Sequence, residues 1–266
     1  MRKAVIVILS ALLLASACGK KKGTIRVAGY EIDSVVVDTT VALVAGSKSA
    51  PTCQLALHLH YLKEKKAQVL NDTLLRAGIL LPDYFSLSNE KLTVKALVDS
   101  FVGRYIEDYL TEYAPLYKVD QEHATAYNVQ YDVRTHFEEG ADGVLTHLAS
   151  IYTFGGGMYG IRQTLALNID TKKAQIVRLA DIIIEGCEQQ VKDIVVEAIM
   201  KKFKAKSLEE LQQQGIFADG ETYLSENFIL GKDALTFIYG EDEIAPHSMG
   251  EIRVKIDKDD LKKYLR

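Results

Sequence analysis

A regular spacing of apolar residues predicts one long helix in the first half of the chain. From about residue 92 to 113, apolar side chains recur every three or four positions and form one wide stripe. They are Val94, Leu97, Val98, Phe101, Val102, Tyr105, Ile106, Tyr109 and Leu110. Because a helix gains much of its stability by burying such a stripe, we expect these residues to lie in the core. Pro115 is expected to end the helix, since proline lacks a backbone N–H.

Alternation of apolar and polar residues predicts strands on both sides of this helix. At 54–61 the apolar side chains Leu55, Leu57, Leu59 and Tyr61 share one face, and His58 and His60 share the other. Further strands are expected at 32–44, 127–133, 144–154, 161–170, 174–179, 228–230, 234–239 and 251–256, and further helices at 67–80, 191–203, 207–214 and 258–264. Strands and helices come in clusters rather than in strict alternation. The pattern predicts an α+β fold with mainly antiparallel sheets, helices packed on one face and two closely associated subdomains.

The N-terminus has the layout of a secretory signal. Arg2 and Lys3 precede an apolar run at 4–14, and small residues follow. The run is shorter than the roughly 20 residues that span a bilayer, so a permanent transmembrane helix is not expected.

The segment Leu14-Ala15-Ser16-Ala17-Cys18-Gly19 resembles the lipobox of bacterial lipoproteins, although Ala15 stands where leucine is usual. The resemblance implies a signal peptide at 1–17, acyl chains on Cys18 that anchor the protein to a membrane, and a tether at 18–30. Lysines rather than acidic residues follow Gly19, which favours an anchor that faces the periplasm over one at the cell surface.

Composition indicates a folded domain and argues against nucleic acid as a partner. The chain has 266 residues, of which 48% are hydrophobic and 26% are charged, and its net charge is −4. Binding to nucleic acid would call for a concentrated basic face.

Two motifs resemble parts of a cofactor or metal site, but each lacks a further element that such a site needs. Gly155 to Gly160 fits the G-x-G-x-x-G pattern, but dinucleotide binding needs a helix next, and 161–170 has the pattern of a strand. We therefore expect a tight turn between strands and no cofactor. His58 and His60 could supply two metal ligands, but no third ligand stands near them in the sequence, so no metal is expected.

Catalytic signatures are also incomplete. His247 and Ser248 are adjacent, but a nucleophile needs a base in reach and a third group that orients the base. The sequence contains neither G-x-S-x-G nor H-E-x-x-H, so no catalytic residue is assigned. Cys53 and Cys187 either pair, as an oxidising compartment allows, or remain two separate thiols.

Several segments of the second half resemble one family in their order. They are Tyr152-Thr153-Phe154, the turn Gly155 to Gly160, Asn168-Ile169-Asp170, 176–182, Phe228-Ile229-Leu230, 235–239 and Glu243-Ile244-Ala245-Pro246. This order resembles the RsiV-type C-terminal domain, a family of uncharacterised function, and 31–157 resembles the PdaC-type N-terminal domain. The resemblance implies domains at 31–157 and 158–266. The family often has Gly-Gly-Ala-His in the turn, whereas Met158 and Tyr159 stand here, so no role of that histidine is carried over.

The resemblance implies a non-enzymatic module that binds or senses a ligand outside the cytoplasm. Its expected ligand is a lysozyme-type muramidase or a peptidoglycan fragment. The expected contact is the turn Gly156, Gly157, Met158, Tyr159 and Gly160. Two alternatives stay open: an envelope hydrolase with an unrecognised site, and a structural subunit of envelope assembly.

Overall fold

The computed structural model describes residues 25–64, 67–85 and 92–266. The expected signal peptide, Cys18 and the first part of the expected tether lie outside the described residues. Within the described ranges, no helix combines the length and apolar character that crossing a membrane requires.

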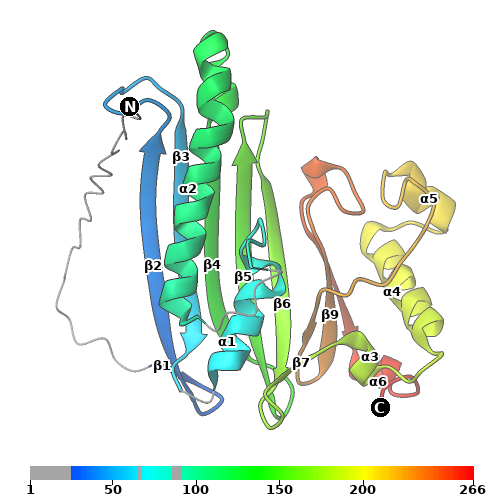
Figure 1. Cartoon of the computed structure of the whole chain (residues 1–266). Helices are drawn as coiled ribbons and strands as arrows, with labels where there is room; N and C mark the ends of the chain where they lie inside the picture. The colour runs from blue at the N-terminus through cyan, green and yellow to red at the C-terminus, as the bar shows by residue number, and fades with distance from the viewer. Residues whose placement is uncertain (1–24, 65–66, 86–91) are drawn as a thin grey trace.

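A seven-stranded sheet forms the first part of the molecule (Figure 1). Its strands follow one another in chain order, and every neighbouring pair is antiparallel except β3 and β4, which are parallel. The strands are β1 (Ile25–Val27), β2 (Tyr30–Ala42), β3 (Thr52–Leu62), β4 (Val129–Glu139), β5 (Val144–Gly155), β6 (Ile161–Asp170) and β7 (Gln175–Val177). The parallel pair needs a long crossover, which carries α1 (Gln68–Leu74), the π-helical turn η2 (Leu75–Ile79), α2 (Val94–Val119) and the 3-10 turn η3 (Ala124–Tyr127).

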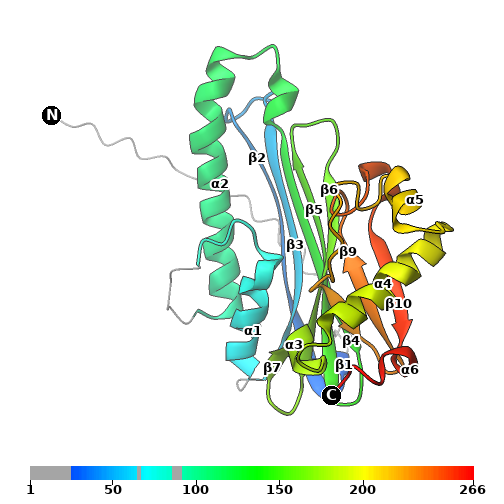
Figure 2. The same cartoon turned by 90° about the vertical axis from the view of Figure 1, so that its right-hand side faces the viewer.

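Helices α1 and α2 cover one face of this sheet, as Figures 1 and 2 show. Leu55, Leu57 and Leu59 of β3 are almost fully buried there and share a hydrophobic cluster with Leu97 and Phe101 of α2. The predicted apolar face of the strand at 54–61 and the predicted apolar stripe of the long helix are therefore confirmed, because the two pack against each other.

Helix α2 does not end at Pro115 as expected, but continues to Val119. The ring contacts of its last turn explain why. Tyr113 and Tyr117 each lie 6.1 Å, between ring centroids, from Tyr127. Pro115 is exposed, so the carbonyl left without its N–H partner can meet water.

The expected tether begins to fold earlier than predicted. Residues 25–27 form β1, and Ala28 and Gly29, both with positive φ, make the two-residue turn into β2. Val27 and Tyr30 pack on a cluster that includes Ile32, which adds apolar burial to the pairing of β1 with β2. The part from 25 to 30 is thus sheet rather than tether.

A C-terminal unit follows β7 and has its own core. Its three-stranded antiparallel sheet has the order β10, β9, β8. The elements are α3 (Leu179–Ile182), α4 (Glu188–Phe203), α5 (Leu208–Gln213), β8 (Phe228–Leu230), β9 (Ala234–Tyr239), the 3-10 turn η4 (His247–Met249), β10 (Ile252–Asp257) and α6 (Lys258–Leu261). Val191, Val195 and Ile199 of α4 are buried against the sheet residues Phe237 and Val254. The predicted α+β class with mainly antiparallel sheets is confirmed.

The C-terminal unit lies on the side of the large sheet opposite α1 and α2 (Figure 2). Leu148 of β5, Ala166 of β6 and Ile238 of β9 form a small buried cluster at the junction. The domain boundary expected at 157/158 falls in the turn between β5 and β6, and both strands belong to the large sheet. That boundary stays a prediction.

Candidate functional site

The glycine turn between β5 and β6 is fixed by close backbone packing. Gly156 has a φ of +74°, and a Cβ built there would lie 1.9 Å from the carbonyl oxygen of Ala126. A Cβ on Gly160 would lie 2.5 Å from the ring of Tyr152. Position 156 therefore requires glycine, whereas a side chain at position 160 would have to displace the Tyr152 ring. Strand β6 follows the turn, so no helix N-terminus is present to hold a pyrophosphate.

The tip of this turn presents two large apolar side chains to solvent. Met158 is 97% exposed and Tyr159 is 57% exposed. The ring of Tyr159 stacks on the imidazole of His247, with centroids 3.9 Å apart and an interplanar angle of 25°. The turn thus rests on the loop that joins β9 to β10. We call Met158, Tyr159 and His247, with their acidic neighbours Glu241 and Asp242, the turn–loop surface.

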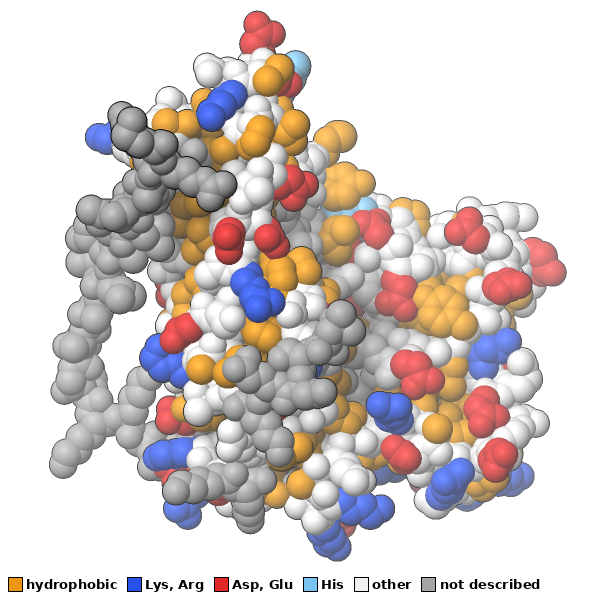
Figure 3. All heavy atoms as spheres, in the orientation of Figure 1, with side chains coloured by type: hydrophobic (Ala, Val, Ile, Leu, Met, Phe, Trp, Pro, Cys, Tyr) orange, Lys and Arg blue, Asp and Glu red, His pale blue; other side chains and the backbone are white. Residues whose placement is uncertain are grey.

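Carboxylates hold the histidine of the turn–loop surface. His247 Nδ1 lies 3.0 Å from Asp242 Oδ2 and 3.9 Å from Glu241 Oε2. Glu241 also accepts a hydrogen bond of 2.6 Å from the backbone N–H of Arg162, the second residue of β6. Figure 3 shows further acidic side chains spread over the upper part of the C-terminal unit. The surface therefore combines an apolar tip with negative charge.

The arrangement lacks the partner that nucleophilic catalysis needs. In the described part of the chain, the imidazole of His247 hydrogen-bonds only Asp242, and the Ser248 hydroxyl makes no hydrogen bond to it. An imidazole beside a carboxylate resembles two members of a triad, but no hydroxyl is held against the ring as a nucleophile.

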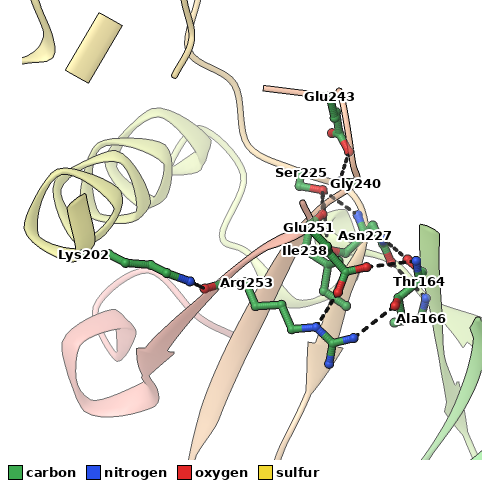
Figure 4. A network of polar contacts seen from close by, with 10 residues as sticks. All are labelled: Thr164, Ala166, Lys202, Ser225, Asn227, Ile238, Gly240, Glu243, Glu251 and Arg253. Atoms are coloured by element: carbon green, nitrogen blue, oxygen red, sulfur yellow. Dashed lines mark hydrogen bonds and ion pairs between the residues drawn. The ribbon is translucent and has the colours of Figure 1, made fainter. Parts of the chain in front are cut away.

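Side chains of the C-terminal unit satisfy the open edge of β6 (Figure 4). The Asn227 amide accepts from the Ala166 N–H at 2.9 Å and donates to the Thr164 carbonyl at 2.6 Å. The Glu251 carboxylate accepts from the Thr164 N–H at 2.9 Å, and Arg253 donates to Glu251 at 2.6 Å and to the Thr164 hydroxyl at 3.0 Å. The edge of one sheet is thus joined to the next by side chains instead of by another strand.

This junction also supports the loop of the turn–loop surface. Glu243 accepts from the Gly240 N–H at 2.5 Å and from the Tyr223 hydroxyl at 2.7 Å. Burial raises the pKa of Tyr223, and the hydrogen bond to Glu243 raises it further, so the hydroxyl remains a donor. The loop therefore meets Tyr159 in a fixed position.

A known protein family matches the sequence of the segment that follows β7. Residues 180–259 match the family model described as "Protein of unknown function (DUF3298)". Over this range the chain is similar to the DUF3298 family. No curated protein sequence matches the chain.

Two solved DUF3298 family structures share the fold. A member from Bacteroides fragilis has 24% identity and a TM-score of 0.77, and the match covers 89% of this chain and 94% of that one. A member from Pseudomonas aeruginosa has 15% identity and a TM-score of 0.61, covering 88% and 94%. At these identities the likeness shows the fold alone. The finer resemblance to RsiV-type and PdaC-type domains stays a prediction.

The DUF3298 segment supplies only part of the candidate site. It contains Asn227, His247 and Glu251, whereas Met158 and Tyr159 precede it. The sequence singled out both the glycine turn and His247, but it gave no sign that the two meet. It also gave no signal for Asn227, whose role depends on the edge of β6.

The two strand histidines lie apart from this site. His58 pairs with Asp38 at 3.0 Å between Nε2 and Oδ1, and the His60 ring hydrogen-bonds the carbonyl of Thr135. Across the described residues, no group of three or more His, Cys, Asp or Glu side chains is placed to hold a metal ion.

Cys53 and Cys187 are free thiols in the structure. Cys53 is buried beside Leu43 and Tyr109 under α2, and burial raises the pKa of its thiol to about 11. Cys187 packs against the separate core of the C-terminal unit. Of the two alternatives, the structure therefore has separate thiols, because the two cysteines belong to different cores.

Proposed function

We propose that the chain is a non-enzymatic, lipid-anchored binding module of the bacterial cell envelope that faces the periplasm. Its partner is a protein of the lysozyme-type muramidase class, which it contacts through the turn–loop surface. Peptidoglycan fragments are the alternative ligand, and the experiment below separates the two.

The supporting observation is an exposed apolar tip on a rigid base. Met158 and Tyr159 stand in solvent, while stacking on His247 and the packing of Gly156 on Ala126 fix the turn. Tyrosine and methionine are enriched at protein interfaces, and a tyrosine held in place loses little conformational entropy on binding.

Charge favours a protein partner with basic groups over a neutral glycan. Glu241 and Asp242 flank the tip, and Glu251 lies next to them at the edge of β6. Complementary charge mainly raises the association rate and selects among partners. Binding should therefore weaken as salt increases.

Titration of the full chain with lysozyme and with purified muropeptides tests the ligand. Tyr159→Ala should weaken lysozyme binding by about tenfold or more, which is typical of an aromatic interface anchor. Val69→Ala is the matched control, because Val69 is 67% exposed but lies on α1. Binding of muropeptides alone, or equal losses in both variants, would contradict the proposed partner and surface.

The anchor is tested separately. Cys18→Ser should release the protein from the membrane fraction, since anchoring by acyl chains adds about 0.8 kcal/mol per buried methylene and needs that thiol. A chain that stays with membranes after this change would contradict lipid anchoring. Release of soluble products from peptidoglycan by the full chain would contradict the non-enzymatic assignment and favour the hydrolase alternative.

A further inference from the structure

A cleft lies on the helix-covered face of the large sheet, between α2 and β4. Its volume is about 200 Å³, and four tyrosines line it, together with Pro82 and Val129. The tyrosines are Tyr84, Tyr105, Tyr109 and Tyr113. Two carboxylates, Asp108 and Glu112, complete the lining. We call this feature the tyrosine cleft.

Contacts behind the cleft fix its aromatic wall. Tyr105 stacks on Tyr131, with centroids 5.5 Å apart and an interplanar angle of 19°. Tyr109 lies 5.5 Å from Tyr113 and donates its hydroxyl to the Tyr127 carbonyl at 3.1 Å. A wall already held in place spends little free energy on ordering when a ligand enters.

The charged side chains that line the tyrosine cleft are both acidic, and the nearby cation Arg104 donates to the Tyr84 carbonyl at 3.0 Å and forms no ion pair with them. Burial raises the pKa of Tyr84, Tyr105 and Tyr109, so these hydroxyls stay neutral. Asp108 accepts a hydrogen bond from the Tyr84 hydroxyl, and neither Asp108 nor Glu112 forms an ion pair with any described residue. Asp108 and Glu112 stand four positions apart on α2, where like charges repel each other. A cation bound between them would therefore reduce this repulsion.

We infer that the tyrosine cleft binds an alkylammonium group. Aromatic faces attract organic cations, and two carboxylates that form no ion pair with the described residues add an electrostatic attraction. The volume is below the roughly 300–1,000 Å³ of clefts that enclose a whole drug-sized ligand, so it suits a headgroup or the end of a side chain. A neutral sugar would leave the two charges uncompensated, and an anion would be repelled.

Titration at constant ionic strength tests the charge requirement. The chain has no tryptophan, and four of its 14 tyrosines line the cleft, so tyrosine emission should change when the cleft is filled, and calorimetry gives the affinity. The probes are tetramethylammonium chloride, n-butylammonium chloride, and neopentyl alcohol as an uncharged isostere. Binding of either ammonium with at least about tenfold preference over the alcohol is expected, and the preferred ammonium distinguishes a quaternary headgroup from a primary amine. Equal binding of the alcohol, or no binding of either ammonium, would overturn the inference.

Charge-removing variants locate the binding. Asp108→Asn and Glu112→Gln keep the side-chain shape and should each weaken ammonium binding by about fivefold. Glu107→Gln removes the same charge from the same helix but lies outside the cleft lining, so it should leave the affinity unchanged. An equal loss in Glu107→Gln would show general attraction to an acidic helix and would refute a specific site. Thermal unfolding of each variant confirms that the fold is kept.

Discussion

Acid should weaken the fold by charging one histidine that the core holds neutral. His147 of β5 is 1% exposed and packs on Phe137, with ring centroids 4.4 Å apart. In the part of the chain that the structure describes, neither of its ring nitrogens has a hydrogen-bond partner. The pKa of His147 falls from 6.5 to about 3, mainly because burial disfavours the charged ring. The backbone of His60 opposes this fall, and the nearby rings of His60 and His136 add to it.

The direction of the effect follows from the two pKa values. The pKa of His147 is lower in the folded than in the unfolded chain, so acid protonates the unfolded chain first. The contribution of this group to the unfolding free energy is therefore complete above about pH 6.5 and is lost as the pH falls toward 3. Each pH unit in that window removes about 1.4 kcal/mol of unfolding free energy. Moving from about pH 7.5 to about pH 5 crosses about 1.5 units of the window, which predicts a loss of about 2 kcal/mol from this group.

Urea denaturation at the two pH values, followed by circular dichroism, measures the loss. His147→Leu should abolish most of it and should raise stability at neutral pH by about 1 kcal/mol, because two unsatisfied buried nitrogens are removed. His123→Gln is the control, since His123 is exposed, pairs with Asp120 at 2.9 Å and is not among the groups that shift the pKa of His147. The reasoning is refuted if His147→Leu loses as much stability in acid as the unchanged chain.

Three further substitutions test other features, each by urea denaturation. Gly156→Ala should cost about 3 kcal/mol, because Gly156 has a positive φ and a Cβ there would clash with the backbone of Ala126. Gly157→Ala should change stability by less than about 0.5 kcal/mol, because a Cβ there would make only an ordinary contact at 3.8 Å; equal effects would contradict this reasoning. Asn227→Ala should cost roughly 3 kcal/mol by leaving two backbone groups of β6 unpaired, and a loss under about 1 kcal/mol would mean that water replaces the amide. Pro115→Ala should raise stability by about 1 kcal/mol or more by restoring a helix N–H, and a lower stability would show that proline shapes the last turn of α2.

Local patterns predicted most of the fold because burial repeats with the period of each element. Leu55, Leu57 and Leu59 are enough to assign one face of β3, and the stripe around Phe101 assigns one face of α2. The helix end at Pro115 was wrong because ring contacts with Tyr127 come from beyond the helix. The parallel pairing of β3 with β4 depends on the crossover and has no short-range signal.

The candidate site was predictable only in pieces. Gly156 and Gly160 stand in a recognisable turn, and His247 attracted notice as a side chain. The stacking of Tyr159 on His247 joins segments far apart in the chain, so no local spacing encodes it. The tyrosine cleft was hidden for a different reason. Two of its tyrosines, Tyr105 and Tyr109, lie within the apolar stripe of α2, where sequence alone cannot separate a ring that lines a cleft from one that fills the core.

The side chains that cover the outer edge of β6 have a consequence for how a newly made chain folds. Strand β6 is complete by residue 170, but the groups that satisfy its outer edge belong to Asn227 and Glu251. A chain that is synthesised from its N-terminus therefore has unpaired backbone groups at the outer edge of β6 until those later residues have been made. During that interval this edge can recruit a neighbouring molecule, so a chain cut after β7 should self-associate where the intact one stays dispersed.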